Sequence, residues 1–353
     1  MARINPGIAS ALLAALLFGA STPLAKLLLQ NVSPVLLAGL LYAGSGLGLL
    51  LVLALRTLRS GRAAGARRTP SLVDLGWWAG AILAGGVAAP VLLLLGLRLL
   101  GAAQASLLLN VEGVLTALLA WFVFRENFDR RLAIGMVAIV LGGIVLSWSP
   151  ASTAGWSFGA LLVACACAAW ALDNNLTRKI ATHDALLIAC AKGLVSGAVN
   201  LTLAVMLGAH WPSARDAGGA MLVGFLGYGV SLTLFVVGLR QLGAARTGAY
   251  FSLAPFFGAA LAICLNGQTV SAALLLAGAL MAIGVWLHLS ERHEHEHPHE
   301  RLEHEHSHRH DEHHRHEHAF SWDGREPHTH RHVHEPLVHA HAHYPDIHHR
   351  HPH

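Results

Sequence analysis

Glu112 is a lone carboxylate in the middle of an apolar segment, with Asn110 and Gly113 beside it. An apolar segment of roughly 20 residues spans the hydrocarbon core of a bilayer as a helix. A charge at that depth is costly unless it faces a cavity or a partner, so such a residue is functional by default. Burial disfavours the charged form of a carboxyl group, which suits proton exchange. We therefore predict that Glu112 carries a proton or an ion; the alternative is a structural hydrogen bond or ion pair.

Lys192 is a second charged side chain at depth, about eight residues into the apolar segment 184–207. From there its ammonium cannot reach the interface by snorkelling over one helical turn. We therefore expect it to face the interior of a helix bundle. It could pair with Glu112 or bind an anionic group of a transported molecule, and the sequence does not separate these roles.

Three consecutive polar residues, Asp173, Asn174 and Asn175, follow Trp170 near one end of the apolar segment 156–177. Consecutive residues of a helix point in different directions, so at least one of the three should face a cavity. The alternative is that the helix ends there. Aromatic and asparagine side chains also serve as contacts between helices. We predict a substrate and ion path formed by Glu112, Lys192, Asp173, Asn174, Asn110, Trp170 and Tyr228.

The second group of residues that could do chemistry lies in a histidine-rich tail, which holds 23 of the 26 histidines. Neutral imidazole is a good ligand for zinc, nickel, cobalt and copper, and histidine-rich tracts are typical of metal binding. The tail has few apolar residues, which predicts disorder without a packed core. The alternative is a pH-responsive or solubilising appendage. The predicted ligands are His293, His295, His297, His299, His304, His306, His308, His310, His313, His314, His316 and His318.

Ten apolar segments position the buried polar residues. Up to about Ser290 the chain is almost continuously apolar, and 54% of all 353 residues are hydrophobic against 12% charged. This predicts an all-α membrane protein, with helices near 6–29, 33–55, 72–97, 101–124, 131–149, 156–177, 184–207, 217–239, 243–265 and 270–289. The net charge of +4 does not indicate a nucleic-acid partner, because the basic residues of this part cluster between apolar runs. The four cysteines all lie in apolar segments, where a thiol behaves as a small hydrophobe.

The basic residues of the connecting segments predict the orientation in the membrane. With the N-terminus in the cytoplasm, thirteen Lys and Arg residues fall on the inner side and three on the outer side. Short cytoplasmic loops carry such an excess. We predict a protein of the bacterial inner (plasma) membrane with both termini in the cytoplasm.

An internal repeat divides the apolar part. The sequence of residues 96–103 recurs with one substitution at 238–245, and residues 18–26 parallel 170–178. Each half has five predicted spans, an odd number, so the two copies cross the membrane in opposite directions. This is the inverted-repeat plan of many secondary transporters. The predicted domains are a first repeat at 1–150, a second at 151–290 and the tail at 291–353.

These halves resemble the EamA repeats of the drug/metabolite transporter superfamily, from about Pro6 to His288. The first segment is similar to that family in Phe18, Gly19, Pro23 and Lys26, and the turn before the fifth is similar in Glu126, with Gly142 and Gly143 following. The resemblance implies a secondary transporter of ten helices. It implies no single substrate, since the family moves amino acids, sugars, nucleotides and other metabolites.

The two halves are chemically unequal. Gln268 stands where the family usually has Glu, and Ala254 and Pro255 occupy the region that corresponds to Glu112. Only the carboxylate of the first half is therefore a candidate carrier.

We predict a transporter, not an enzyme, that exports a small polar metabolite such as an amino acid by alternating access, coupled to protons. It requires no cofactor, although a divalent metal could occupy the tail, and its oligomeric state is open. The alternative is a divalent-metal transporter, or a membrane-anchored metal sensor, that uses the tail. The apolar part argues against metal transport, because His183, His210 and His288 all lie at segment ends.

Overall fold

The structure is a computed structural model of the chain. It covers residues 6–60, 72–124, 130–148, 156–179, 185–242, 244–289, 294–299, 302–308, 328–334 and 337–342, the described residues below. The chain divides into two compact units, Met1–Leu289 and Ser290–His353.

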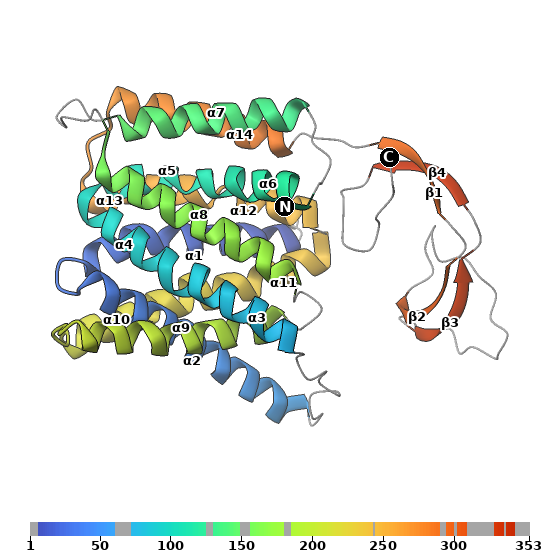
Figure 1. Cartoon of the computed structure of the whole chain (residues 1–353), viewed down its shortest axis with the longest axis horizontal. Coiled ribbons are helices and arrows are strands. Elements are labelled where there is room, and N and C mark those ends of the chain that lie inside the picture. The colour runs from blue at the N-terminus through green and yellow to red at the C-terminus, as the bar shows by residue number, and fades with distance from the viewer. Residues whose placement is uncertain are drawn as a thin grey trace, which may run out of the picture. The chain divides into compact units, whose positions relative to one another are not determined.

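The first unit is a bundle of apolar helices (Figure 1). Its helices are α1 (Pro6–Leu28), α2 (Pro34–Ser60), α3 (Leu72–Ala81), α4 (Ala89–Leu99), α5 (Ala102–Leu108), α6 (Asn110–Phe124), α7 (Arg130–Ser147), α8 (Phe158–Lys179), α9 (Ala185–Met206), α10 (Ala214–Gly224), α11 (Ser231–Leu242), α12 (Ala244–Phe251), α13 (Ala254–Asn266) and α14 (Ala272–Leu289). Two π-helices, η1 (Ile82–Ala88) and η2 (Phe225–Val230), continue α3 into α4 and α10 into α11.

The predicted membrane spans are confirmed. Within the described residues, nine helical segments are long and apolar enough to cross a membrane, and a tenth, Ala272–Leu287, is apolar but shorter. Each coincides with one of the ten predicted segments. The protein is therefore an all-α integral membrane protein.

The helix irregularities repeat between the two halves. The third span of each half contains a π-helix, η1 or η2, and the fourth is broken into two helices, α5 and α6 or α12 and α13. A π-helix shifts the backbone hydrogen bonds by one residue and often marks a functional site. The same defects at corresponding places support two copies of one structural unit.

Small residues allow the helices to approach closely. The helix α2 lies along α9, α7 lies along α14, and α1 contacts α11 and α13 (Figure 1). Between α2 and α9, a Cβ added at Gly193 would lie 2.7 Å from the Cα of Gly46. Because lipid supplies no hydrophobic drive for helices to associate, such close backbone packing stabilises the bundle.

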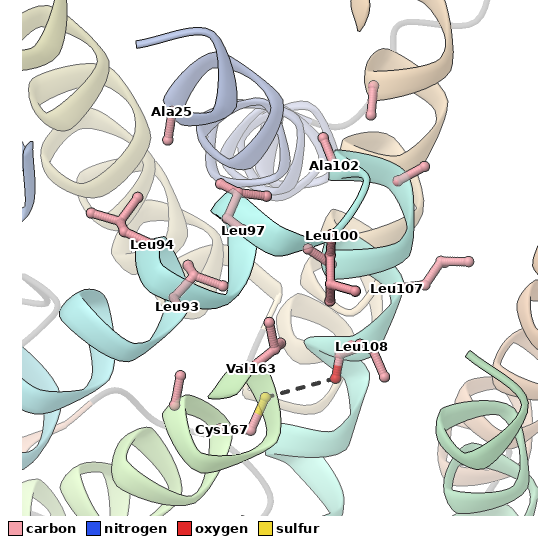
Figure 2. Packing of buried hydrophobic residues seen from close by; sticks show 14 of the residues in the cluster. Ala25, Leu93, Leu94, Leu97, Leu100, Ala102, Leu107, Leu108, Val163 and Cys167 are labelled. Atoms are coloured by element: carbon pink, nitrogen blue, oxygen red, sulfur yellow. Dashed lines mark hydrogen bonds between the residues drawn. The ribbon is translucent and has the colours of Figure 1, made fainter. Parts of the chain in front are cut away.

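Part of the buried apolar core lies where α4, α5 and α8 meet. Figure 2 shows Leu97 at the end of α4, Leu100 in the turn before α5, and Val163 and Cys167 of α8 near Leu108. The Cys167 thiol donates to the Leu108 carbonyl oxygen, 3.7 Å away (Figure 2). This carbonyl group is near the break between α5 and α6. The thiol therefore supplies a hydrogen-bond donor to a backbone oxygen at a helix end.

Lys26 and Gln268 support the turn between α4 and α5. The Lys26 ammonium donates to the carbonyl oxygens of Leu97 at 2.6 Å and Leu100 at 3.0 Å. The Ala103 amide donates to Gln268 Oε1 at 2.9 Å. Both side chains satisfy backbone groups at helix ends, where a cation suits a C-terminus and an acceptor suits an N-terminus. Gln268 can fill this role as Glu would, because only an acceptor oxygen is used.

The second unit contains short strands in its described parts. Strand β1 (Glu294–His299) pairs with β4 (Leu337–Ala342), and β2 (Leu302–His308) pairs with β3 (His328–His334), both antiparallel.

Candidate functional site

A buried ion pair joins α8 to α9. The Lys192 ammonium lies 2.5 and 2.6 Å from the two carboxylate oxygens of Asp173. The side chains are only 17% and 7% exposed, respectively. Thr177, one turn along α8, donates its hydroxyl to Asp173 Oδ1 at 2.9 Å. The pair lies six or seven residues from the nearer helix ends, roughly 10 Å at 1.5 Å per residue, so it is within the apolar layer.

The partner of Lys192 differs from one of the two roles that the sequence left open. The ammonium pairs with Asp173 and not with Glu112; the role in cargo binding stays a prediction. The physical reason is that a buried ammonium needs a carboxylate within contact distance. Spacing along the chain does not reveal which of two carboxylates on different helices lies closer.

The three polar residues of α8 point to three different partners. The helix continues through them to Lys179, so the alternative that it ends there is excluded. Asp173 contacts Lys192, whereas the Asn174 amide donates to Glu112 Oε1 at 2.9 Å. Asn175 is buried and donates to the Ala171 carbonyl oxygen at 2.8 Å.

Glu112 lies on α6 and faces α8. Asn174 also donates to Thr116, one turn after Glu112, at 3.3 Å. Glu112 is half-buried and its amide partner is neutral. Because Asn174 follows Asp173 directly on α8, a single helix holds both carboxylate environments.

The π-helix η1 forms the wall beside the ion pair. The Gly85 carbonyl oxygen accepts hydrogen bonds from Trp170 Nε1 at 3.0 Å and from the Tyr42 hydroxyl at 2.7 Å. A side chain at Gly85 would overlap the carboxylate of Asp173. Trp170 is thus at the predicted site, and the absence of a Cβ at Gly85 makes room for Asp173.

Tyr228 and Asn110 have different positions relative to this cluster. The Tyr228 ring lies 5.5 Å from the ring of Tyr42 and 6.0 Å from that of Phe18, so it joins the site through Tyr42. Asn110 donates to the Leu107 carbonyl oxygen at 2.9 Å. Its amide therefore satisfies backbone at the break between α5 and α6.

Sequence reasoning missed a polar stripe on α9. Ser196 and Asn200 follow Lys192 at intervals of four, both fully buried, and Asn200 donates to the Gly86 carbonyl oxygen at 2.8 Å. Residues spaced by four share one face of a helix, so the spacing could have identified them. Tyr42 carried no comparable signal, because a tyrosine in an apolar segment is usually a packing residue.

The repeat places a neutral residue where the other half has the carboxylate of Asp173. Residues 18–26 parallel 170–178, so Ser21 corresponds to Asp173. Gly85 packs on Asp173, and in the same way a Cβ at Gly227 would lie 2.8 Å from Ser21 Cβ. The contact is conserved in geometry between the halves, but only one copy is charged.

The described membrane helices show no candidate metal site. Where side chains are described, no three His, Cys, Asp or Glu residues are grouped as metal ligands would be. Of the predicted tail ligands, six lie on strands: His295, His297, His299, His304, His306 and His308. The others lie outside the described residues: His293, His310, His313, His314, His316 and His318. Glu126 also lies outside them.

Inverted repeats, broken helices and a buried charge pair are features of membrane transporters. The chain belongs to the EamA-like transporter family, which matches it twice, at residues 5–148 and 157–290. It is 29% identical over 296 residues to a protein described as an uncharacterized transporter of Methanothermobacter thermautotrophicus, covering 80% of this chain and 85% of the relative.

Two further comparisons concern a second relative and a solved structure. The uncharacterized transporter YyaM of Bacillus subtilis is 23% identical over 208 residues, 55% of this chain and 68% of that protein. A solved structure titled "Crystal structure of protein" superposes with a TM-score of 0.59 at 20% identity, over 79% of this chain and 95% of that one. This structural likeness shows the fold alone.

One substitution tests how η1 supports the ion pair. Gly85→Ala should lower the thermal midpoint and reduce transport, because the added methyl group displaces the Asp173 carboxylate from Lys192. The matched control is Gly76→Ala on α3, where an added Cβ meets nothing within 4 Å. Alanine is favoured over glycine in a helix by about 1 kcal/mol, so the control should be neutral or stabilising. Equal melting curves and fluxes for the two variants would contradict the role of Gly85.

Proposed function

We propose that this protein exports a small zwitterionic metabolite, such as an amino acid, by alternating access coupled to protons. The observation that carries the proposal is the Asp173–Lys192 pair within the apolar layer. The carboxylate of a zwitterion can replace Asp173 at Lys192, while its ammonium pairs with Asp173. Both buried charges then stay compensated during exchange, which a cargo of only one sign would not achieve.

Glu112 is the proposed proton carrier. It is linked to the ion pair through Asn174, the residue that follows Asp173. Protonation of Glu112 removes a negative charge beside Asn174 of α8. Cargo binding changes the charges around Asp173, the preceding residue of the same helix. The proposed orientation has both termini in the cytoplasm of a bacterial cell, based on the positive-inside distribution.

Flux measurements in proteoliposomes test the substrate class. An imposed pH gradient should drive saturable flux of an amino acid. The corresponding amine, which lacks the carboxylate, and the corresponding acid, which lacks the ammonium, should compete at least about tenfold less well (about 1.4 kcal/mol). Competition by the amine or the acid as strong as that of the amino acid would overturn the zwitterion proposal.

The second candidate function is transport of a divalent metal, which the histidine-rich tail favours. A chain that ends at Ser290 separates the two candidates in the same assay. Amino-acid flux that persists without the tail supports metabolite transport. Metal flux that requires the tail, without amino-acid flux in either chain, would favour the metal function.

A further inference from the structure

Three aromatic rings, those of Phe18, Tyr42 and Tyr228, form a continuous group beside the ion pair, called here the aromatic cluster. The centroid of the Tyr42 ring lies 5.5 Å from that of Tyr228, which lies 6.0 Å from that of Phe18. The Tyr42 hydroxyl donates to the carbonyl oxygen of Gly85, the residue that packs on Asp173. The aromatic cluster and the ion pair therefore share one wall, the π-helix η1.

The aromatic cluster is the counterpart of the charged site in the other half of the repeat. The first spans of the two halves correspond, so Phe18 has the place of Trp170. The second span of each half has a Leu-Leu pair near its start, and the residue six positions after the first leucine is Tyr42 in one half and Lys192 in the other. One copy of the site thus has the ion pair, and the other copy has aromatic rings.

The aromatic cluster faces away from the exposed side of α1. Phe18 is near the middle of that helix, and Leu13 and Leu16, the exposed leucines closest to it, are 46% and 42% exposed. A residue of a helix is turned by about 100° from the one before, which puts Phe18 about 140–160° around the axis from these leucines. The helix α1 contacts helices of both halves, among them α4, α5, α11 and α13. The rings of the cluster are half-buried, so cargo inside the bundle can reach them.

We propose that the aromatic cluster binds the side chain of the cargo, and that the protein prefers amino acids whose side chain is aromatic. This inference rests on the proposed function, in which the zwitterionic group of the cargo is at Asp173 and Lys192. Aromatic rings attract one another at centroid separations of about 4.5–7 Å, and the rings of the cluster lie in that range. Each ring contact with the cargo should raise affinity roughly two- to tenfold. Phe18, Tyr42 and Tyr228 are then the residues that determine specificity.

A purely structural cluster makes a different prediction. Rings that only pack α1 and α2 against η2 would affect the stability of the fold and the flux of every amino acid alike. Rings that bind cargo would affect the ratio between an aromatic and a small amino acid. The ratio of phenylalanine to alanine in competition therefore separates the two roles.

Competition for amino-acid exchange in proteoliposomes measures this ratio. In the native protein, phenylalanine should compete at least about tenfold better than alanine. Phe18→Leu and Tyr228→Leu each remove a ring and keep an apolar side chain, so each should reduce the ratio several-fold, mainly through a higher KM for phenylalanine. Tyr228→Phe restores the ring and should restore the ratio. The matched control is Phe158→Leu at the start of α8, where the native side chain is 65% exposed, and it should keep the native ratio.

The outcomes distinguish this inference from the proposed function. Exchange of both amino acids with equal competition by alanine and phenylalanine would overturn the aromatic preference and leave the proposed function standing. Absence of exchange for every amino acid would overturn both. A native ratio in both Phe18→Leu and Tyr228→Leu, or an equal loss in Phe158→Leu, would mean that the cluster does not bind the side chain. If one leucine variant does not fold, the other variant and the ratio in the native protein decide.

Discussion

Lys192→Met should destabilise the protein strongly and stop transport. The substitution leaves the Asp173 carboxylate, whose side chain is 7% exposed, without its cation. Removing one partner of a buried ion pair costs about 3–5 kcal/mol, because the remaining charge stays buried and uncompensated. The expected result is a marked drop in the thermal midpoint of the purified protein, with no amino-acid flux in proteoliposomes.

A double variant separates the structural from the transport role of the pair. Asp173→Asn combined with Lys192→Met removes both charges, and replacing a buried pair with neutral side chains is often close to neutral in stability. The double variant should therefore regain most of the thermal midpoint and still fail to transport. Recovery of both properties together would mean that the pair only holds α8 and α9 together.

Asp216, a half-buried carboxylate outside the ion pair, provides the control for this series. Asp216 is at the start of α10, where its backbone amide donates to Ser213 Oγ at 3.1 Å. Its side chain is half-buried and accepts from the Ser213 hydroxyl at 2.8 Å. Asparagine keeps an acceptor oxygen, so Asp216→Asn should change stability by about 1 kcal/mol at most and leave flux intact. Both substitutions remove a single charge. A larger loss of stability and flux in Lys192→Met would therefore be due to the burial of the charge that remains unpaired.

The membrane architecture could be predicted because its signal is local. Ten apolar runs of sufficient length require helices, and two similar stretches separated by an odd number of spans require inverted copies. Glu112 and Lys192 could be selected as unusual for the same reason, since a charge in an apolar run stands out without knowledge of its neighbours.

The partners of these charges could not be predicted, because they depend on distances between helices. Asp173 lies near the end of its segment in the sequence, where a helix cap was an equal alternative. The role of η1 was also hidden: Gly85 carries no side chain, yet it makes room for Asp173 and its carbonyl oxygen accepts from Trp170 and Tyr42.

Glu112→Gln should uncouple transport from the pH gradient while leaving the fold intact. Glutamine retains an oxygen that can accept the hydrogen bond from Asn174, which is 2.9 Å long in the native protein. The change in stability should therefore be within about 1 kcal/mol, the net contribution of an ordinary hydrogen bond. The amide cannot gain or release a proton, so no ion crosses with the cargo at this site.

Two flux measurements distinguish loss of coupling from loss of transport. Exchange of labelled for unlabelled amino acid needs no driving force and should persist in Glu112→Gln, because Asp173 and Lys192 remain. Accumulation driven by a pH gradient should fall to the level of passive exchange. Glu112→Asp is the control, since it keeps an ionisable group on the same turn of α6 and should retain part of the driven flux. Accumulation in Glu112→Gln that still follows the pH gradient would assign the coupling proton to another group, with Asp173 as the next carboxylate on the path.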